Sequence, residues 1–238
     1  MFTLIVNATQ AGDLYADDLP TMSLLEALSP EKERQILDGA ARAFAEDGYE
    51  GASMSRIAAV AGVSKGTLYN YFAGKRELFA AFVQRECSHK IRLIFDDIDA
   101  TAAPETMLPR ICRRMLDMLT SPTGLLMYRM VVAEAGKFPE LAVAFYEAGP
   151  RRALAAMADW IGSQREAGRL AVDDPEFAAE QLFGLMQTRL LMRCRLRLTL
   201  DVTDAELDRV VAAGVRVFLR AYAVQAATPA ETHGQPPR

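Results

Sequence analysis

The sequence predicts an all-α protein with an N-terminal helix-turn-helix unit and a larger helical C-terminal domain. Apolar residues recur at helical spacing in every periodic segment, and no alternating strand of useful length occurs. The run SMSRIAAVAGVSKGTLYNYF, from Ser53 to Phe72, shows two short helical patterns joined by a tight turn. After that run, most of the 238 residues remain for a second helical part.

The first helix is predicted to begin at Ser29 and Pro30, an N-cap residue followed by a proline at the first helical position. Its apolar residues lie at positions 36, 37, 40, 41 and 44, and Gly48 supplies the stop. Residues 1–28 show no such periodicity, so we expect a flexible extension. Met22 could be the true start of the chain.

The two short helices come next. Ser53 is the predicted cap of the first, whose inward-facing residues are Ile57, Ala58 and Ala61. Gly62 permits the sharp turn, and Val63 fills the angle between the helices. Ser64 is the predicted cap of the second short helix.

Longer helices are predicted for the remainder. One runs from Gly74 and Lys75 to about Asp99, and others follow near 105–120, 123–136 and 151–167. A further helix is expected from Asp174 to about Leu198, and the last from Thr203 to about Val224 with Glu206 completing a capping box. We therefore expect domains at 29–76 and 77–226, and a disordered, proline-containing tail at 227–238.

Composition limits the class of protein. The net charge of −4 does not exclude a nucleic-acid partner, because phosphate binding needs local positive charge and not a basic chain as a whole. The longest acid-free stretch lies between Glu50 and Glu77 and contains basic residues. The cysteines Cys87, Cys112 and Cys194 lack metal-type spacing, so we expect no metal, no cofactor and a reducing cytoplasm. The N-terminus is a poor signal peptide, and no apolar run is long enough to span a membrane.

Basic residues at helix starts favour a phosphate partner. Three cations lie at the N-terminal, positive ends of predicted helices, namely Lys65, Lys75 and Arg76. Each of them destabilises its helix by roughly 0.3–1 kcal/mol, and a bound phosphate would reverse this effect. The hydroxyls of Tyr69 and Tyr71 could donate to phosphate oxygens, although the ring of Tyr71 could instead pack inward. A plain helical hairpin with an apolar interior remains the alternative interpretation.

The span from about Arg34 to Phe82 resembles the N-terminal domain of TetR-family transcriptional regulators. The similarity is carried by Gly48, the segment from Ile57 to Ser64, the block from Leu68 to Phe72 and the segment from Lys75 to Leu78. The resemblance implies that phosphates or bases are contacted by residues Ser53, Ser64, Thr67, Tyr69, Tyr71 and Lys75. Lys65, Gly66 and Asn70 would tune sequence choice, and Asn70 could pair with adenine or be a solvated surface residue.

The stretch from Phe138 to Leu170 is similar to the C-terminal domain of the AefR-like subgroup. This resemblance implies that the C-terminal helices bind a small effector and form a homodimer. We expect the last two helices to build a four-helix bundle through two apolar stripes: Ala178, Ala179, Leu182, Leu185 and Met186, and Val210, Val211, Gly214, Val215, Phe218 and Leu219. A dimer would place two recognition helices about 34–36 Å apart on a near-palindromic operator in double-stranded DNA.

Large apolar residues and two polar ones are the candidates for the effector pocket: Met127, Met130, Glu134, Phe145, Trp160, Phe183, Met186 and Gln187. Any of them could equally be core. The basic cluster at Arg189, Arg193, Arg195 and Arg197 allows three interpretations: pairing with Asp201, Asp204 or Asp208, an acidic-ligand site, or a lowered pKa for a redox-active Cys194.

Two rival functions are considered. Gly62 to Gly66 matches the nucleophile elbow of serine hydrolases, but both flanks of Ser64 are predicted helices and the chain has only His89 and His233. An architectural DNA-binding protein would have a filled C-terminal core. We favour a non-enzymatic repressor whose operator affinity falls when ligand shifts the helix that begins at Lys75. Activation instead of repression stays open.

Overall fold

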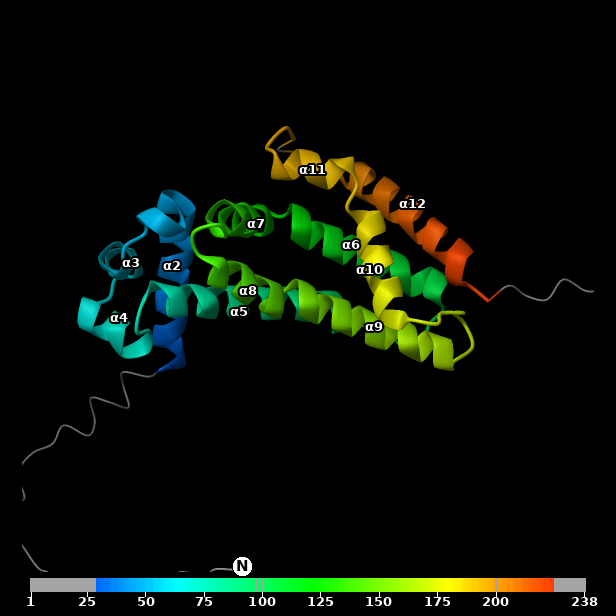
Figure 1. The fold of residues 1–238 in the computed structure, drawn as a ribbon, viewed down its shortest axis with the longest axis horizontal. Helices are drawn as coiled ribbons and strands as arrows, with labels where there is room; N and C mark the ends of the chain where they lie inside the picture. Colours follow the sequence, from blue (N-terminus) through cyan, green and yellow to red (C-terminus); the bar gives the residue numbers. More distant parts are fainter. Residues whose placement is uncertain (1–28, 97, 100, 200, 225–238) are drawn as a thin grey trace, which may run out of the picture.

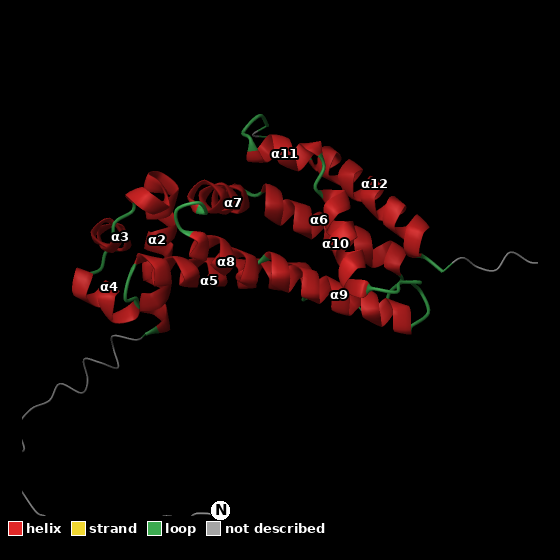
Figure 2. Cartoon of the chain, viewed as in Figure 1, coloured by secondary structure: helices red, strands yellow, loops and turns green. Residues whose placement is uncertain are grey.

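A computed structural model describes residues 29–96, 98–99, 101–199 and 201–224 (Figure 1). Across these ranges the secondary structure is helical, without a strand, and the single isolated β-bridge pairs Leu170 with Ala223 (Figure 2). The all-α prediction is confirmed. The predicted extension at 1–28 and the tail at 227–238 lie outside the described residues.

The N-terminal part consists of α2 (Pro30–Gly51), α3 (Met54–Ala61) and α4 (Lys65–Tyr71). Local chemistry starts each helix, because the side chains of Ser29, Ser53 and Ser64 accept hydrogen bonds from backbone N–H groups in the first turn. Gly48 and Gly62 have φ of 70° and 68°, a left-handed conformation that suits glycine. The regular part of α2 therefore ends at Gly48, as predicted.

The C-terminal part contains eight helices among the described residues. They are α5 (Lys75–Phe95), α6 (Pro104–Thr120), α7 (Pro122–Glu134), α8 (Pro139–Ala148), α9 (Pro150–Glu166), α10 (Pro175–Met186), α11 (Arg189–Arg195) and α12 (Asp204–Tyr222). The molecule is elongated, with α2, α3 and α4 at one end and α9 and α12 extending toward the other (Figure 1). Thr203 and Glu206 form the predicted capping box of α12.

Two hydrophobic clusters divide the interior. One joins α2, α3 and α4 to the first half of α5 and to α7 and α8, through residues such as Phe44, Phe79 and Met130. The other joins α6, α9, α10, α11 and α12, and it includes Trp160 and Phe218. The N-terminal core thus continues beyond residue 76, and α5 runs from it into the C-terminal part.

Three predicted helix bounds need correction. The helix expected from Asp174 to Leu198 is divided at Gln187 and Thr188, where Gln187 adopts φ −85° and ψ 57°. The helix that begins at Lys75 ends at Phe95 instead of Asp99. Between the helices predicted near 123–136 and 151–167, where none was predicted, residues 139–148 form α8, and Pro139 occupies its favoured first-turn position.

Candidate nucleic-acid interface and ligand cavity

The short helix α4 has one buried and one exposed face. Leu68 is fully buried and Phe72, the residue that ends α4, is 5% exposed, so both anchor the helix in the N-terminal cluster. Lys65, Gly66, Tyr69 and Asn70 lie on the opposite side and are exposed. This spacing presents one continuous polar face to solvent.

Close packing fixes α3, and hence α4, against α2. An ideal Cβ on Gly39 would lie 2.4 Å from the Cβ of Ala61, so only glycine allows the two helices to approach this closely. Gln35 Nε2 donates to the carbonyl of Ala61 at 2.7 Å, and Arg42 Nη2 donates to the carbonyl of Val60 at 2.9 Å. These bonds satisfy carbonyls at the C-terminal end of α3 that lack helical partners.

The predicted DNA-contact residues fall into two groups by exposure. Exposed are Ser53, Ser64, Lys65, Gly66, Tyr69 and Asn70; half-buried are Thr67, Tyr71 and Lys75. Ser64 Oγ accepts a hydrogen bond from the backbone N–H of Thr67 at 2.9 Å and lies 2.8 Å from its hydroxyl. The exposure of Asn70 is compatible with both of its interpretations.

Lys75 and Tyr71 are engaged within the protein. Lys75 Nζ donates to the carbonyls of Tyr49 at 2.7 Å and Glu50 at 3.0 Å, and it lies 4.6 Å from the centroid of the Tyr49 ring. A cation at the C-terminal end of α2 is favourable, which offsets its unfavourable place at the start of α5. Burial lowers the pKa of Lys75. The Tyr71 hydroxyl donates to the carbonyl of Ser29 at 3.3 Å.

Ser64 does not have the setting of a catalytic serine. It stands between α3 and α4, and its oxygen caps α4. A nucleophile elbow needs a strand before the serine, and the described residues contain none. They also contain no cluster of three or more potential metal ligands, and no helix among them is long and apolar enough to cross a bilayer.

The C-terminal part contains a partly enclosed cavity of about 340 Å³ between α5, α6, α7, α8, α9, α10 and α11. Its apolar lining includes Ile91, Met115, Met118, Leu119, Met127, Phe145 and Phe183. Five polar or charged residues also line it, namely Glu86, Lys90, Tyr128, Gln187 and Arg195. A mostly apolar enclosure with few polar groups is typical of a small-molecule site.

The structure brings four of the predicted effector residues to this cavity and places four elsewhere. Met127, Phe145, Phe183 and Gln187 line it. Met130 belongs to the cluster shared with α2, Trp160 is core between the outer helices, and the Met186 methyl covers Gly214 of α12. Glu134 lies at the end of α7, near Lys75 and Lys137.

The structure bears on two of the three interpretations of the basic cluster and leaves the acidic-ligand site as a prediction. Asp204 and Asp208 pair with Arg113 of α6 instead of the arginines of α11. Arg195 alone of the four lines the cavity, where its Nη1 donates to Gln187 Oε1 at 3.2 Å and its guanidinium lies 3.9 Å from the Tyr128 ring centroid. Burial raises the pKa of Cys194, so the neighbouring arginines do not make it a reactive thiolate.

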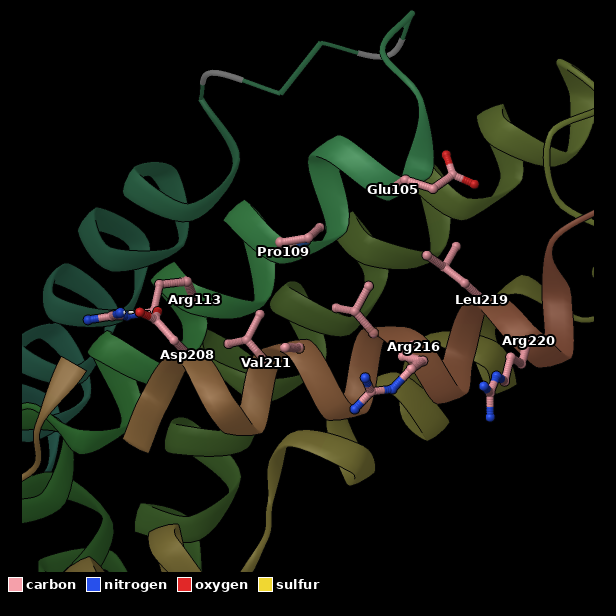
Figure 3. A pocket seen from close by; sticks show the side chains of 10 residues that line it. Glu105, Pro109, Arg113, Asp208, Val211, Arg216, Leu219 and Arg220 are labelled. Atoms are coloured by element: carbon pink, nitrogen blue, oxygen red, sulfur yellow. Dashed lines mark hydrogen bonds and ion pairs between the residues drawn. The ribbon is translucent and has the colours of Figure 1, made fainter. Parts of the chain in front are cut away.

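A second hollow is an open groove of about 600 Å³ between α6 and α12 (Figure 3). Val211 and Leu219 lie along it, Arg216 and Arg220 lie at its edge, and the Arg113–Asp208 pair closes one end (Figure 3). The groove is shallow surface between two packed helices. We therefore place the candidate effector site in the enclosed cavity.

The apolar face that remains free on α10 and α12 differs from the predicted stripes. Ala178, Leu182, Met186, Val211, Val215 and Phe218 are buried inside the chain, because α10 and α12 pack against α9, α6 and each other. Phe177 and Val217 are 54% and 52% exposed. Gly184, Leu185, Ala213 and Ala221 lie in two shallow grooves beside Val217. The outward face of the two helices is thus apolar and small-residue-rich.

Lys90 was not among the predicted effector residues, although the sequence contains a signal for it. Along α5 the buried positions 79, 83, 87 and 94 form a helical stripe, and Lys90 occupies the place between Cys87 and Ile94. A lysine in an apolar stripe marks a buried charge. The stripe itself was visible, but the cavity that it borders depends on helices far apart in sequence.

Comparisons with known proteins match both parts of the chain. Residues 36–82 match the family model described as "Bacterial regulatory proteins, tetR family". Residues 106–224 match the model described as "AefR-like transcriptional repressor, C-terminal domain". These spans cover the helix-turn-helix and most of the cavity lining.

Individual proteins agree with the family models. The HTH-type transcriptional repressor Rv1474c of Mycobacterium tuberculosis is 29% identical over 188 residues, which cover 75% of this chain and 94% of that protein. The repressor AcnR of Corynebacterium glutamicum is 35% identical, but the match covers only 32% of this chain and 41% of AcnR.

Solved structures share the fold over most of the chain. A crystal structure from Mesorhizobium loti, described as a TetR-family transcriptional regulator, has a TM-score of 0.76 and 32% identity. The match covers 82% of this chain and 98% of that one. The flavonoid-responsive regulator FrrA has a TM-score of 0.70 and 32% identity, and covers 83% and 100%.

Proposed function

The chain belongs to the TetR family of bacterial transcriptional regulators, and from that premise we propose that it is a homodimeric repressor that a small molecule releases from a palindromic operator. The observation that carries this proposal is the path of α5. Its first turns pack in the helix-turn-helix core, and its second half lines the enclosed cavity. One rigid element therefore joins the two sites.

DNA binding uses the exposed face of α4. Its Lys65, Gly66, Tyr69 and Asn70 enter the major groove, where base edges carry a distinct donor and acceptor pattern. Ser53 and the Ser64–Thr67 pair lie at the starts of α3 and α4 and contact phosphates. Lys75 and Tyr71 form hydrogen bonds to backbone carbonyls within the protein. They contact phosphate only if these hydrogen bonds break.

The outward face of α10 and α12 forms the dimer contact. Val217 and Phe177 are large apolar side chains left in solvent by the single chain, and small residues beside them allow close helix approach. Pairing that face with its symmetric copy buries it in a four-helix bundle. The dimer then presents two α4 helices to two half-sites of an operator.

The effector occupies the cavity and changes the position of the α4 helices. Two contacts outside α5 also connect the cavity helices to α2. The Phe138 ring, between α7 and α8, lies 5.2 Å from the Tyr49 ring, and Lys137 pairs with Glu50 at 2.7 Å. A ligand that moves α5 and α7 therefore moves α2 together with α3 and α4. The two α4 helices of the dimer then no longer match the spacing of the two operator half-sites.

The relatives favour repression by a ligand-responsive protein. Rv1474c and AcnR are named as repressors, and FrrA is named as flavonoid-responsive. The enclosed cavity also favours this function over an architectural DNA-binding role, for which a filled C-terminal core is expected. Repression takes place in the cytoplasm, where the operator is.

The test has two stages. Operators are first selected from random DNA with the full-length protein, and a palindromic motif bound by a dimer is expected. A thermal-shift screen then identifies cavity ligands, and each ligand is titrated into the protein–operator complex. Bound ligand that leaves operator affinity unchanged refutes the switch, and a non-palindromic motif bound by monomer refutes the dimer.

A further inference from the structure

The cavity contains a buried cation without a partner. Lys90 Nζ is shielded from solvent and makes no hydrogen bond in the protein. Burial also lowers the pKa of Lys90. A buried ammonium group normally has a compensating partner, because its desolvation is costly. The missing partner is best explained by something that occupies the cavity.

The charges near Lys90 do not supply a hydrogen-bonded partner, although the Glu86 carboxylate attracts the lysine through space and opposes the lowering of its pKa. The Glu86 carboxylate accepts a hydrogen bond from Arg85 at 3.0 Å and makes no ion pair with Lys90. Arg195 adds a second positive charge, and it contacts the amide of Gln187 and the ring of Tyr128 instead of a carboxylate. The lining thus carries two cations against one carboxylate that is already paired.

The remaining lining residues favour a ligand with a large apolar part. Methionine, phenylalanine and leucine side chains from α6, α7, α8 and α10 surround the space beside Lys90. Met115, Met118 and Met127 are unbranched and can adapt to ligands of different shape. The volume of about 340 Å³ admits a compact molecule near the lower end of the usual range for small-molecule pockets.

Resting on the proposed effector role of the cavity, we propose that its ligand is an amphipathic organic acid whose carboxylate pairs with Lys90 while its apolar part fills the methionine-lined space. Arg195 is the second positive group at this site and favours the same ligand charge. A neutral ester or alcohol of the same shape fills the same volume but leaves Lys90 unpaired. The site therefore discriminates by charge as well as by size.

The experiment compares acids with their own methyl esters. Octanoate, decanoate, dodecanoate and naphthoate, each with its ester, are titrated by calorimetry into the full-length dimer and into Lys90→Met. The wild type is expected to bind at least one acid roughly 10–100-fold more tightly than its ester, the range for a charge-assisted hydrogen bond. Lys90→Met is expected to lose this preference.

Two controls separate charge recognition from structure. Arg92→Met removes an exposed positive charge on the same helix and should keep the acid preference. Lys90→Met should also melt at a higher temperature than the wild type in the absence of ligand, because it removes a buried unpaired cation. Lys90→Gln, which keeps a polar group without the charge, covers the case in which Lys90→Met does not fold.

Each outcome has a defined meaning. Wild-type protein that binds esters as tightly as acids, or that binds no member of the panel, overturns the inference, as does an acid preference retained by both Lys90 variants. Operator affinity is measured alongside. An acid that binds through Lys90 but does not release DNA refutes the proposed switch alone. A neutral ligand that releases DNA and binds more tightly than its matching acid refutes the acid preference alone.

Discussion

Gly39→Ala tests the packing that positions the recognition helix. A Cβ at residue 39 would lie 2.4 Å from the Cβ of Ala61, 2.5 Å from its Cα and 2.8 Å from its backbone nitrogen. Because two of these atoms are backbone, no side-chain rotation relieves the contact, and α3 must move. Overpacking of this kind costs about 1–3 kcal/mol, and the better helix propensity of alanine returns about 1 kcal/mol. We expect the free energy of unfolding to fall by about 2 kcal/mol, which is the upper end of the difference between these two effects.

The displacement should also weaken DNA binding. Moving α3 away from α2 stretches the bonds from Gln35 and Arg42 to the end of α3, and α4 follows. Urea unfolding at one protein concentration measures the free energy of unfolding, and fluorescence anisotropy measures operator affinity, which should fall at least tenfold. Gly162→Ala in α9, where an added Cβ meets nothing within 4 Å, is the control and should be neutral or stabilising. A Gly39→Ala protein with the stability and the operator affinity of the wild type would contradict the role of this close contact.

Four further predictions follow from individual contacts. Tyr69→Phe should weaken operator binding by about 1.5–3 kcal/mol per lost phosphate bond, and more than Tyr71→Phe, whose hydroxyl is already bound to a backbone carbonyl; equal effects in anisotropy would contradict this. Phe138→Ala should leave ligand binding intact but reduce the ligand-induced loss of operator affinity, since it removes a ring contact with α2; unchanged release would count against that connection. Val217→Glu should give a monomer by light scattering, because it places a charge in the proposed dimer face; a dimer that persists would exclude this face. Native protein at pH 8 should resist alkylation at Cys112, since burial raises the pKa of this thiol to about 12 and the thiolate is therefore scarce below that pH; rapid labelling in a mass-spectrometric time course would contradict its burial.

Local features of the fold were predictable from the sequence. The caps Ser29, Ser53 and Ser64 each bond to a backbone N–H a few residues away, so the residue type and its place carry the information. Gly48 and Gly62 adopt the positive φ expected of helix-ending glycines. These short-range signals were enough to predict the helix-turn-helix.

Features that depend on distant residues were not predictable. The role of Lys75 is determined by the end of α2, whose carbonyls it reaches across 25 and 26 residues of sequence. The break after Met186 has no glycine or proline, and the apolar pattern continues through it. For the same reason only four of the eight effector candidates line the cavity. Amphipathic spacing identifies buried residues but not which of them border an empty volume.

We infer that occupancy of the cavity controls the affinity of the protein for DNA. The most direct measurement is the dissociation constant of the full-length protein for its selected operator, without ligand and with a cavity ligand at a concentration shown by calorimetry to saturate the protein. We expect the dissociation constant to increase at least tenfold when the ligand is bound, within the usual coupling free energy of about 1–3 kcal/mol. An unchanged dissociation constant at full occupancy would contradict it.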